Sequence, residues 1–165
     1  METFKFIDII FCIPIIQDVI EHLICDGDLY EDYNAVIAAK LANVHTLEIK
    51  GNEMLLLSNI ILNACVLGTL RDITFRFRGY QPSILERELQ NAHQIQRLQQ
   101  RILDLSPKSV TFDVDVCGNS TRQMFLSAAE LTKNTLKESF PKVFGQGMAK
   151  IVVVEGKYKF ILAHT

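Results

Sequence analysis

Three short segments of the chain alternate apolar and polar residues, the pattern of a strand with one buried face. They are HTLEIKG (45–51), ITFRFRG (73–79) and VTFDVDVCG (110–118). Each reads threonine, apolar, charged, apolar, charged, and each reaches a glycine soon afterwards. Because successive side chains of a strand point to opposite faces, the apolar residues share one face and the charged residues the other. The recurrence predicts a repeated structural unit.

Helical periodicity separates these predicted strands. One helix is predicted over 53–67, and a longer one over 83–105 begins with Ser83 and Glu86 at capping-box spacing. The apolar residues of the longer helix recur every three or four positions, which predicts one inner stripe. This stripe contains Leu85, Leu89, Ala92, Ile95, Leu98, Ile102 and Leu105.

A third helix is predicted over about 121–138, with Ser120 and Gln123 as its capping box. The residues expected on its buried side are Met124, Leu131 and Leu136.

The two ends of the chain complete the expected order of elements. Two helices, at about 15–25 and 29–42, are predicted before the first strand. A loop over 140–149 leads to a β-hairpin that turns at Glu155-Gly156-Lys157.

The charged strands decide the expected fold class. Strands covered by helices on both faces are nearly continuous hydrophobic runs, whereas these strands alternate. We therefore expect a single α/β domain with a small, mostly parallel sheet, helices on one face, and the other face open. Residues 1–42 would form a helical cap, 43–118 the strand-helix repeats, and 119–165 a helix and the hairpin.

The open face is the candidate binding surface. Were the strands adjacent in chain order, the arginines of 73–79 would lie between rows that carry carboxylates. The residues expected on this face are Glu48, Lys50, Arg76, Arg78, Tyr80, Asp113 and Asp115.

Composition limits the function classes. The chain has 165 residues, 48% of them hydrophobic and 22% charged, which suits one globular domain. The net charge of −2 provides no general attraction to nucleic acid or acidic membranes. The apolar N-terminal run is interrupted by Asp8 and Pro14, so we expect packed structure there rather than a membrane span.

Candidate chemistry is sparse. The four cysteines form no CxxC motif, so we expect free, buried thiols in the reducing cytoplasm or nucleus. The histidines are scattered over different predicted elements and lack metal-site spacing. Asp113 and Asp115 could share a cation or a proton, but a solvated charged face explains them better. We therefore expect no catalytic residues, metal or cofactor.

One segment resembles a leucine-rich repeat. VHTLEIKGNEM (44–54) fits the template L-x-x-L-x-L-x-x-N-x-L, with Asn52 at the asparagine position. In the next two units Tyr80 and Cys117 replace that asparagine. The resemblance implies a degenerate solenoid or a related one-layer α/β domain.

Residues 13–41 resemble an F-box. Ile13-Pro14 stands at the Leu-Pro position of that motif, whereas Ile16 replaces its glutamate and its late tryptophan is missing. The resemblance implies an adaptor of a cullin ubiquitin ligase that binds a Skp-type linker and holds a client on the open face. A plain helical cap would have the same apolar spacing. The linker-binding residues that the resemblance implies are Ile13, Pro14, Ile20, Ile24 and Leu29.

The expected function is non-catalytic protein binding through the open face, in its sharper form as an F-box-like adaptor. The alternative is a nucleic-acid-binding domain that uses Arg76, Arg78 and Lys50, with Tyr80 stacking on a base. A glutamine-rich side of the helix 83–105 could bind a partner helix, or it could be solvated. Edge strands beside a half-bare sheet also leave a homodimer open.

Overall fold

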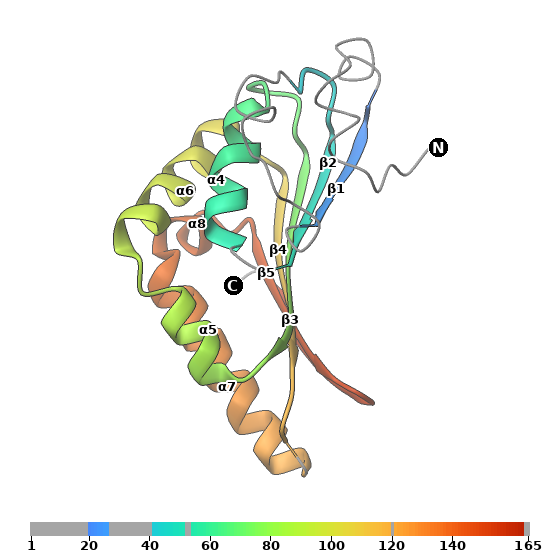
Figure 1. The fold of residues 1–165 in the computed structure, drawn as a ribbon, viewed down its shortest axis with the longest axis vertical. Helices are drawn as coiled ribbons and strands as arrows, with labels where there is room; N and C mark the ends of the chain where they lie inside the picture. Colours follow the sequence, from blue (N-terminus) through green and yellow to red (C-terminus); the bar gives the residue numbers. More distant parts are fainter. Residues whose placement is uncertain (1–19, 27–40, 52–53, 120, 164–165) are drawn as a thin grey trace.

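The computed structural model describes residues 20–26, 41–51, 54–119 and 121–163. Within them, one sheet has its strands in chain order, with β1 to β5 parallel and β6 antiparallel to β5 (Figure 1). The strands are β1 (His22–Asp26), β2 (Thr46–Lys50), β3 (Asp72–Tyr80), β4 (Ser109–Val116), β5 (Ala149–Glu155) and β6 (Tyr158–Leu162).

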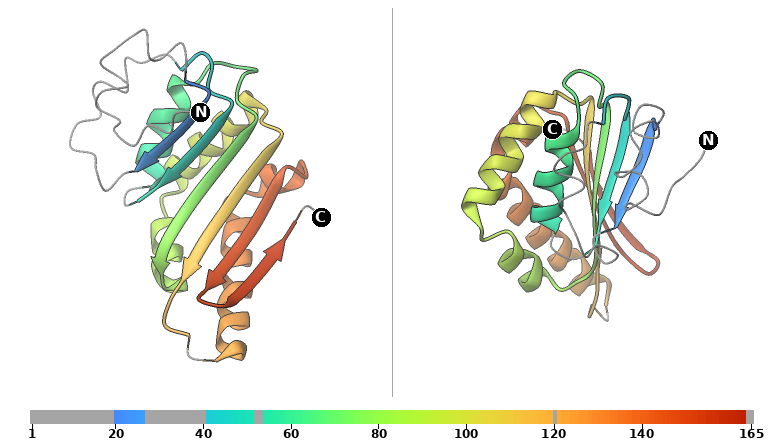
Figure 2. Two further views of the ribbon diagram at one scale, coloured as in Figure 1. Left: turned by 90° about the vertical axis from the view of Figure 1, so that its right-hand side faces the viewer. Right: turned by 45° about the horizontal axis from the view of Figure 1, so that its top comes forward.

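The helices of the described residues pack on one face of this sheet (Figure 1, Figure 2). Crossovers between parallel strands are right-handed, so a sheet that always grows in the same direction places every crossover on the same side. The predicted α/β class, with a mostly parallel sheet and helices on one face, is confirmed. The helices are α4 (Met54–Ala64), α5 (Pro82–Glu88), α6 (Ala92–Leu105), α7 (Arg122–Ser139) and α8 (Pro141–Gly145).

The core lies between the sheet and the helices. The predicted alternation is confirmed in β2, β3 and β4, where every second residue is buried up to Phe77 in β3. Phe75 and Phe112 stack at 5.5 Å between ring centroids, and Phe112 also contacts the rings of Phe140 and Phe144. These aromatic contacts join neighbouring parallel strands to the C-terminal helices.

The helix predicted over about 15–25 is wrong for residues 22–26. They form β1, which pairs in parallel with β2 and buries Leu23 and Cys25. A short apolar run fits either period, and here pairing with the edge of β2 selects the strand. The rest of this prediction lies outside the described residues, as does the predicted helix 29–42 up to residue 40. The end of this second predicted helix is wrong, because Leu41 forms a parallel β-bridge with Cys65.

The helix predicted over 83–105 is two helices. The chain turns after α5, and Asn91 begins α6 by accepting a hydrogen bond from the amide of Gln94 at 3.1 Å. Ser83 does not cap α5, whose N-cap is Gln81 without a side-chain bond. The predicted inner stripe is buried apart from Ala92, which the break exposes.

Helix α7 has the predicted extent but a different buried side. Thr121, rather than Ser120, caps it by accepting from the amide of Met124 at 3.2 Å. Leu136 is buried as expected, whereas Met124 and Leu131 are exposed. Phe125 and the small residues Ala128 and Ala129 face the sheet instead. Small side chains at these positions allow the helix to lie close to β5 and β6.

The C-terminal hairpin is confirmed, with Gly156 at φ +54° in its turn. The loop predicted over 140–149 contains the short helix α8.

Candidate functional site: the open face of the sheet

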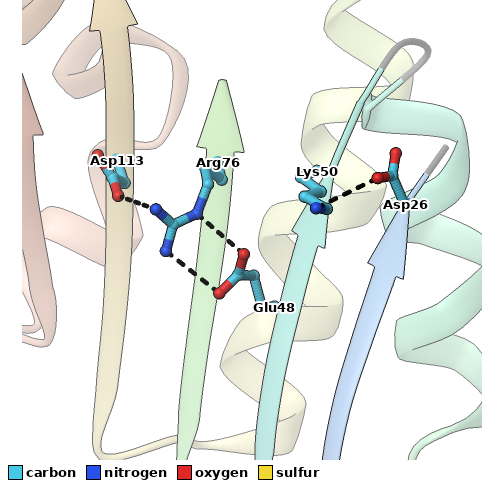
Figure 3. A network of polar contacts seen from close by, with 5 residues as sticks. All are labelled: Asp26, Glu48, Lys50, Arg76 and Asp113. Atoms are coloured by element: carbon cyan, nitrogen blue, oxygen red, sulfur yellow. Dashed lines mark hydrogen bonds and ion pairs between the residues drawn. The ribbon is translucent and has the colours of Figure 1, made fainter. Parts of the chain in front are cut away.

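The strand register brings charged residues from four strands into one row. Asp26, Lys50, Arg76 and Asp113 are successive partners across β1, β2, β3 and β4 (Figure 3). All four lie on the face opposite the helices, as the two-residue alternation predicts.

Arg76 is the centre of this row. Its Nε donates to Oε1 of Glu48 at 2.9 Å and its Nη2 donates to Oε2 at 3.2 Å. Its Nη1 lies 3.0 Å from Oδ2 of Asp113. Arg76 therefore connects β2 and β4 through two carboxylates, as expected for strands adjacent in chain order (Figure 3).

Lys50 forms a second, separate ion pair, with the first strand. Its Nζ lies 3.2 Å from Oδ2 of Asp26. The paired side chains keep 21–31% of their surface exposed, so water screens them only in part. Each such pair contributes about 0.2–1 kcal/mol, too little to determine the fold. The pairs hold the long side chains of Glu48, Lys50 and Arg76 in place on the open face.

A β-bulge in β3 places Arg78 and Tyr80 on opposite faces of the sheet. The register between β3 and β4 shifts between Phe77 and Tyr80, with Gly79 at φ +65°. Arg78 stays exposed, but Tyr80 turns to the helix side, where it is 9% exposed and packs edge-to-face on Phe77 at 5.7 Å. The placement of Tyr80 on the open face is therefore wrong. The glycine that follows the alternation is the sequence signal of such a bulge.

The open face also has an apolar end that sequence reasoning missed. Val152 of β5 pairs with Ile161 of β6, and Ile161 is 50% exposed. Val154 lies next to them on the same face. The run KIVVVE hides this alternation, because apolar residues occupy both faces of β5.

The F-box-like residues do not form one surface in the described part of the chain. Ile20 is 4% exposed and belongs to the core, whereas Ile24 lies in β1 on the open face. Ile13, Pro14 and Leu29 lie outside the described residues.

A groove of about 730 Å³ separates α5 and α6 from α7 and α8 on the helical side. Several glutamines of the predicted polar side line it, including Gln96 and Gln99. Gln99 is buried, and its Oε1 accepts a hydrogen bond from the backbone amide of Lys142 at 2.9 Å. The side chain of Gln99 thus joins α6 to the start of α8 instead of meeting solvent.

The described cysteines are free thiols in two different environments. Cys25 and Cys65 are buried as expected, and burial raises the pKa of Cys65 to about 12. The pKa of Cys25 is raised well above its usual range, first by burial and second by the neighbouring Cys65. Cys117 is exposed, against expectation, because it follows the last buried position of β4.

Two further observations concern the described residues. No group of three histidine, cysteine or carboxylate side chains in the described ranges is placed to hold a metal ion. Helices with both the length and the hydrophobicity of a bilayer span do not occur in this part of the chain.

Comparison with known proteins returned no match to a protein-family model, to a curated protein or to a solved structure.

Proposed function

We propose that this protein is a non-catalytic module that binds a protein partner on the open face of its sheet. The observation that carries the proposal is the ordered row of side chains across β1 to β4, on the face that the described helices leave bare. Side chains already fixed by ion pairs lose little further freedom when a partner binds, which lowers the entropic cost of association.

The apolar end of the face supports the same function. Val152 and Ile161 lie beside the charged row, since Asp113 is the register partner of Val152. A protein interface commonly combines an apolar centre with polar groups around it. The open face offers both within one continuous sheet.

The charge balance favours protein over nucleic acid as the partner. Arg76 is neutralised by Glu48 and Asp113, and Lys50 is paired with Asp26. A phosphate chain would have to displace these carboxylates, with Asp115 nearby to repel it. A protein surface can complement charges of both signs.

The cullin-ligase adaptor is a narrower form of this proposal that needs a Skp-type linker on residues 13–41. Its helical requirement is not met at 22–26, which pair as a strand. We therefore restrict the proposal to the open face and a client-like protein partner.

Site-specific photo-crosslinking in cells tests the proposal. A photoreactive benzoylphenylalanine replaces Arg78, which is exposed on the open face, or Arg97, which is exposed on α6 and does not line the groove. We expect a discrete protein adduct from position 78 that is absent from position 97 and competed by the unlabelled protein. Equal labelling from both positions, or an adduct that nuclease removes, would overturn it.

A further inference from the structure

Strand β6 ends the sheet, and no strand of the described residues pairs with its outer side. The Gly156-Lys157 turn has two residues, so the flanking pair Glu155 and Tyr158 exchanges hydrogen bonds, as does every second pair beyond it. Phe160 therefore bonds to Val153 of β5. The main-chain amides and carbonyls of Lys159 and Ile161 point outward.

The side chains at this edge are incompletely covered on both faces. On the helix side, Tyr158, Phe160 and Leu162 pack against the core but remain only partly buried. On the open face, Ile161 is 50% exposed beside Val152. An additional strand would cover apolar surface on both faces and satisfy the outward main-chain groups.

The electrostatic surroundings of the edge are cationic. Lys150 and Lys159 lie on the open face of β5 and β6, and Lys157 is exposed in the turn. Helix α7 turns Thr135 and Glu138 toward α5 and α6, where they line the groove. The 100° spacing of a helix then places Lys137 on the side of α7 away from this groove.

The nearby carboxylates do not cancel this positive charge. Glu155 accepts from the amide and the side-chain Nδ2 of Asn119, at 2.9 and 2.7 Å, and keeps its negative charge because these donors are neutral. Glu130 pairs with Lys133 on α7. The three lysines at 150, 157 and 159 outnumber Glu155, so an incoming chain would meet a surplus of positive charge.

We propose that the outer edge of β6 binds an extended, acidic segment of a partner protein, which adds to the sheet as a further strand. A second copy of β6 is a poorer occupant, because it would bring the two sets of lysines together. A nucleic acid would find phosphate contacts, but it would leave the exposed Ile161 and the outward amides without a partner. This edge is distinct from the row around Arg76, so the proposal goes beyond binding on the open face.

The test uses the full chain and a defined probe. The probe is an end-blocked, fluorescent heptapeptide of alternating glutamate and valine, and its counterpart has lysine in place of glutamate. We expect saturable binding of the glutamate peptide, measured by anisotropy, and at least tenfold weaker binding of the lysine peptide.

Two variants separate main-chain pairing from charge. Ile161→Pro removes an outward amide without touching the bonds to β5, and should weaken binding of the glutamate peptide at least tenfold. Ile161→Thr keeps that amide and should weaken binding less than threefold. Lys159→Glu should weaken it about tenfold through charge alone. Circular dichroism verifies that each variant remains folded.

Several outcomes would overturn the proposal. Equal affinity for the two peptides would exclude charge recognition, and unchanged binding by Ile161→Pro would exclude main-chain pairing. A dimer in ultracentrifugation that Ile161→Pro dissociates would identify a second copy as the occupant. Displacement of the peptide by oligouridylate would identify a nucleic acid. Crosslinking from position 78 does not depend on β6, so failure here and failure of the open-face proposal are distinguishable.

Discussion

Arg76 binds Glu48 through two parallel hydrogen bonds, with the guanidinium on β3 and the carboxylate on β2. This bidentate geometry is the strongest form of a side-chain ion pair, and Asp113 adds a third contact from β4. Glu48 and Arg76 are not direct register partners, since Glu48 lies opposite Thr74. The length of the arginine side chain makes the diagonal contact.

The first prediction concerns this ion pair. Arg76→Met should lower the free energy of unfolding by about 1 kcal/mol at low salt, because it leaves Glu48 and Asp113 close together without a cation. The coupling energy with Glu48→Gln should be about 0.5–1 kcal/mol in a double-mutant cycle measured by urea denaturation.

Salt and a neighbouring arginine provide the controls. Both effects should shrink in 1 M NaCl, where screening is strong. Arg78→Met should change stability by less than about 0.5 kcal/mol, since Arg78 is exposed and makes no ion pair with the described residues. A coupling energy of zero at low salt would contradict the prediction.

The second prediction concerns the contact of α6 with the end of α4. Arg101 donates from Nε to the carbonyl of Leu62 at 3.0 Å and from Nη2 to the carbonyl of Cys65 at 2.8 Å. It thus satisfies carbonyls at the negative end of α4, which has no basic residue in its own last turn. Arg101→Met should cost about 2 kcal/mol, measured by thermal or urea unfolding.

Arg97 supplies a matched control on the same helix, because it lies one turn earlier and is exposed. Arg97→Met should change stability by less than about 0.5 kcal/mol. Equal costs for the two variants would show that the carbonyl contacts of Arg101 contribute nothing measurable.

The third prediction concerns a buried hydroxyl. Thr132 on α7 is 1% exposed, and its Oγ1 has no hydrogen-bond partner among the residues that the structure describes. Thr132→Val keeps the side-chain shape and removes the unsatisfied hydroxyl. We expect it to raise the free energy of unfolding by about 1 kcal/mol.

Thr135→Val is the control, because Thr135 lies one turn later and lines the open groove. Its effect should be within about 0.5 kcal/mol of zero. Destabilisation by Thr132→Val would mean that the hydroxyl has a partner in solution.

The alternation of 73–79 and 110–118 was sufficient to predict the sheet, its covered face and the direction of Arg76. These properties depend on local periodicity, which can be read directly from the sequence. The position of Tyr80 depends on a register shift against β4, and the strand at His22–Asp26 depends on pairing with β2. Such non-local pairing leaves little trace in a single sequence.

The helices and β5 also combine features that local periodicity predicts with features that it does not. The apolar stripe predicted most of the buried positions of α5 and α6, but Asn91 interrupts the helix where the stripe continues unbroken. The apolar end of the open face was hidden because β5 also buries Ile151 and Val153 on its other face. Sequence periodicity therefore located the charged part of the candidate surface and missed its hydrophobic part.

The fourth prediction concerns pH and the buried thiol of Cys65. Burial raises its pKa from 9.0 to about 12, although Arg101 acts in the opposite direction. The unfolded chain therefore loses this proton at lower pH than the folded protein does. The contribution of the protonated Cys65 thiol to the free energy of unfolding is fully present below pH 9 and is lost as the pH rises toward 12.

Urea denaturation of wild type and Cys65→Ala at pH 8 and pH 10, under reducing conditions, checks this sign. The stability advantage of wild type should shrink by about 1 kcal/mol between the two pH values, because only wild type has the thiol to ionise. Taking the difference cancels the titration of lysines and tyrosines shared by both proteins. Val143→Ala, a buried truncation that removes no titratable group, should differ from wild type equally at both pH values. A pH-independent advantage over Cys65→Ala would mean that the Cys65 thiol ionises as readily in the folded protein as in the unfolded chain.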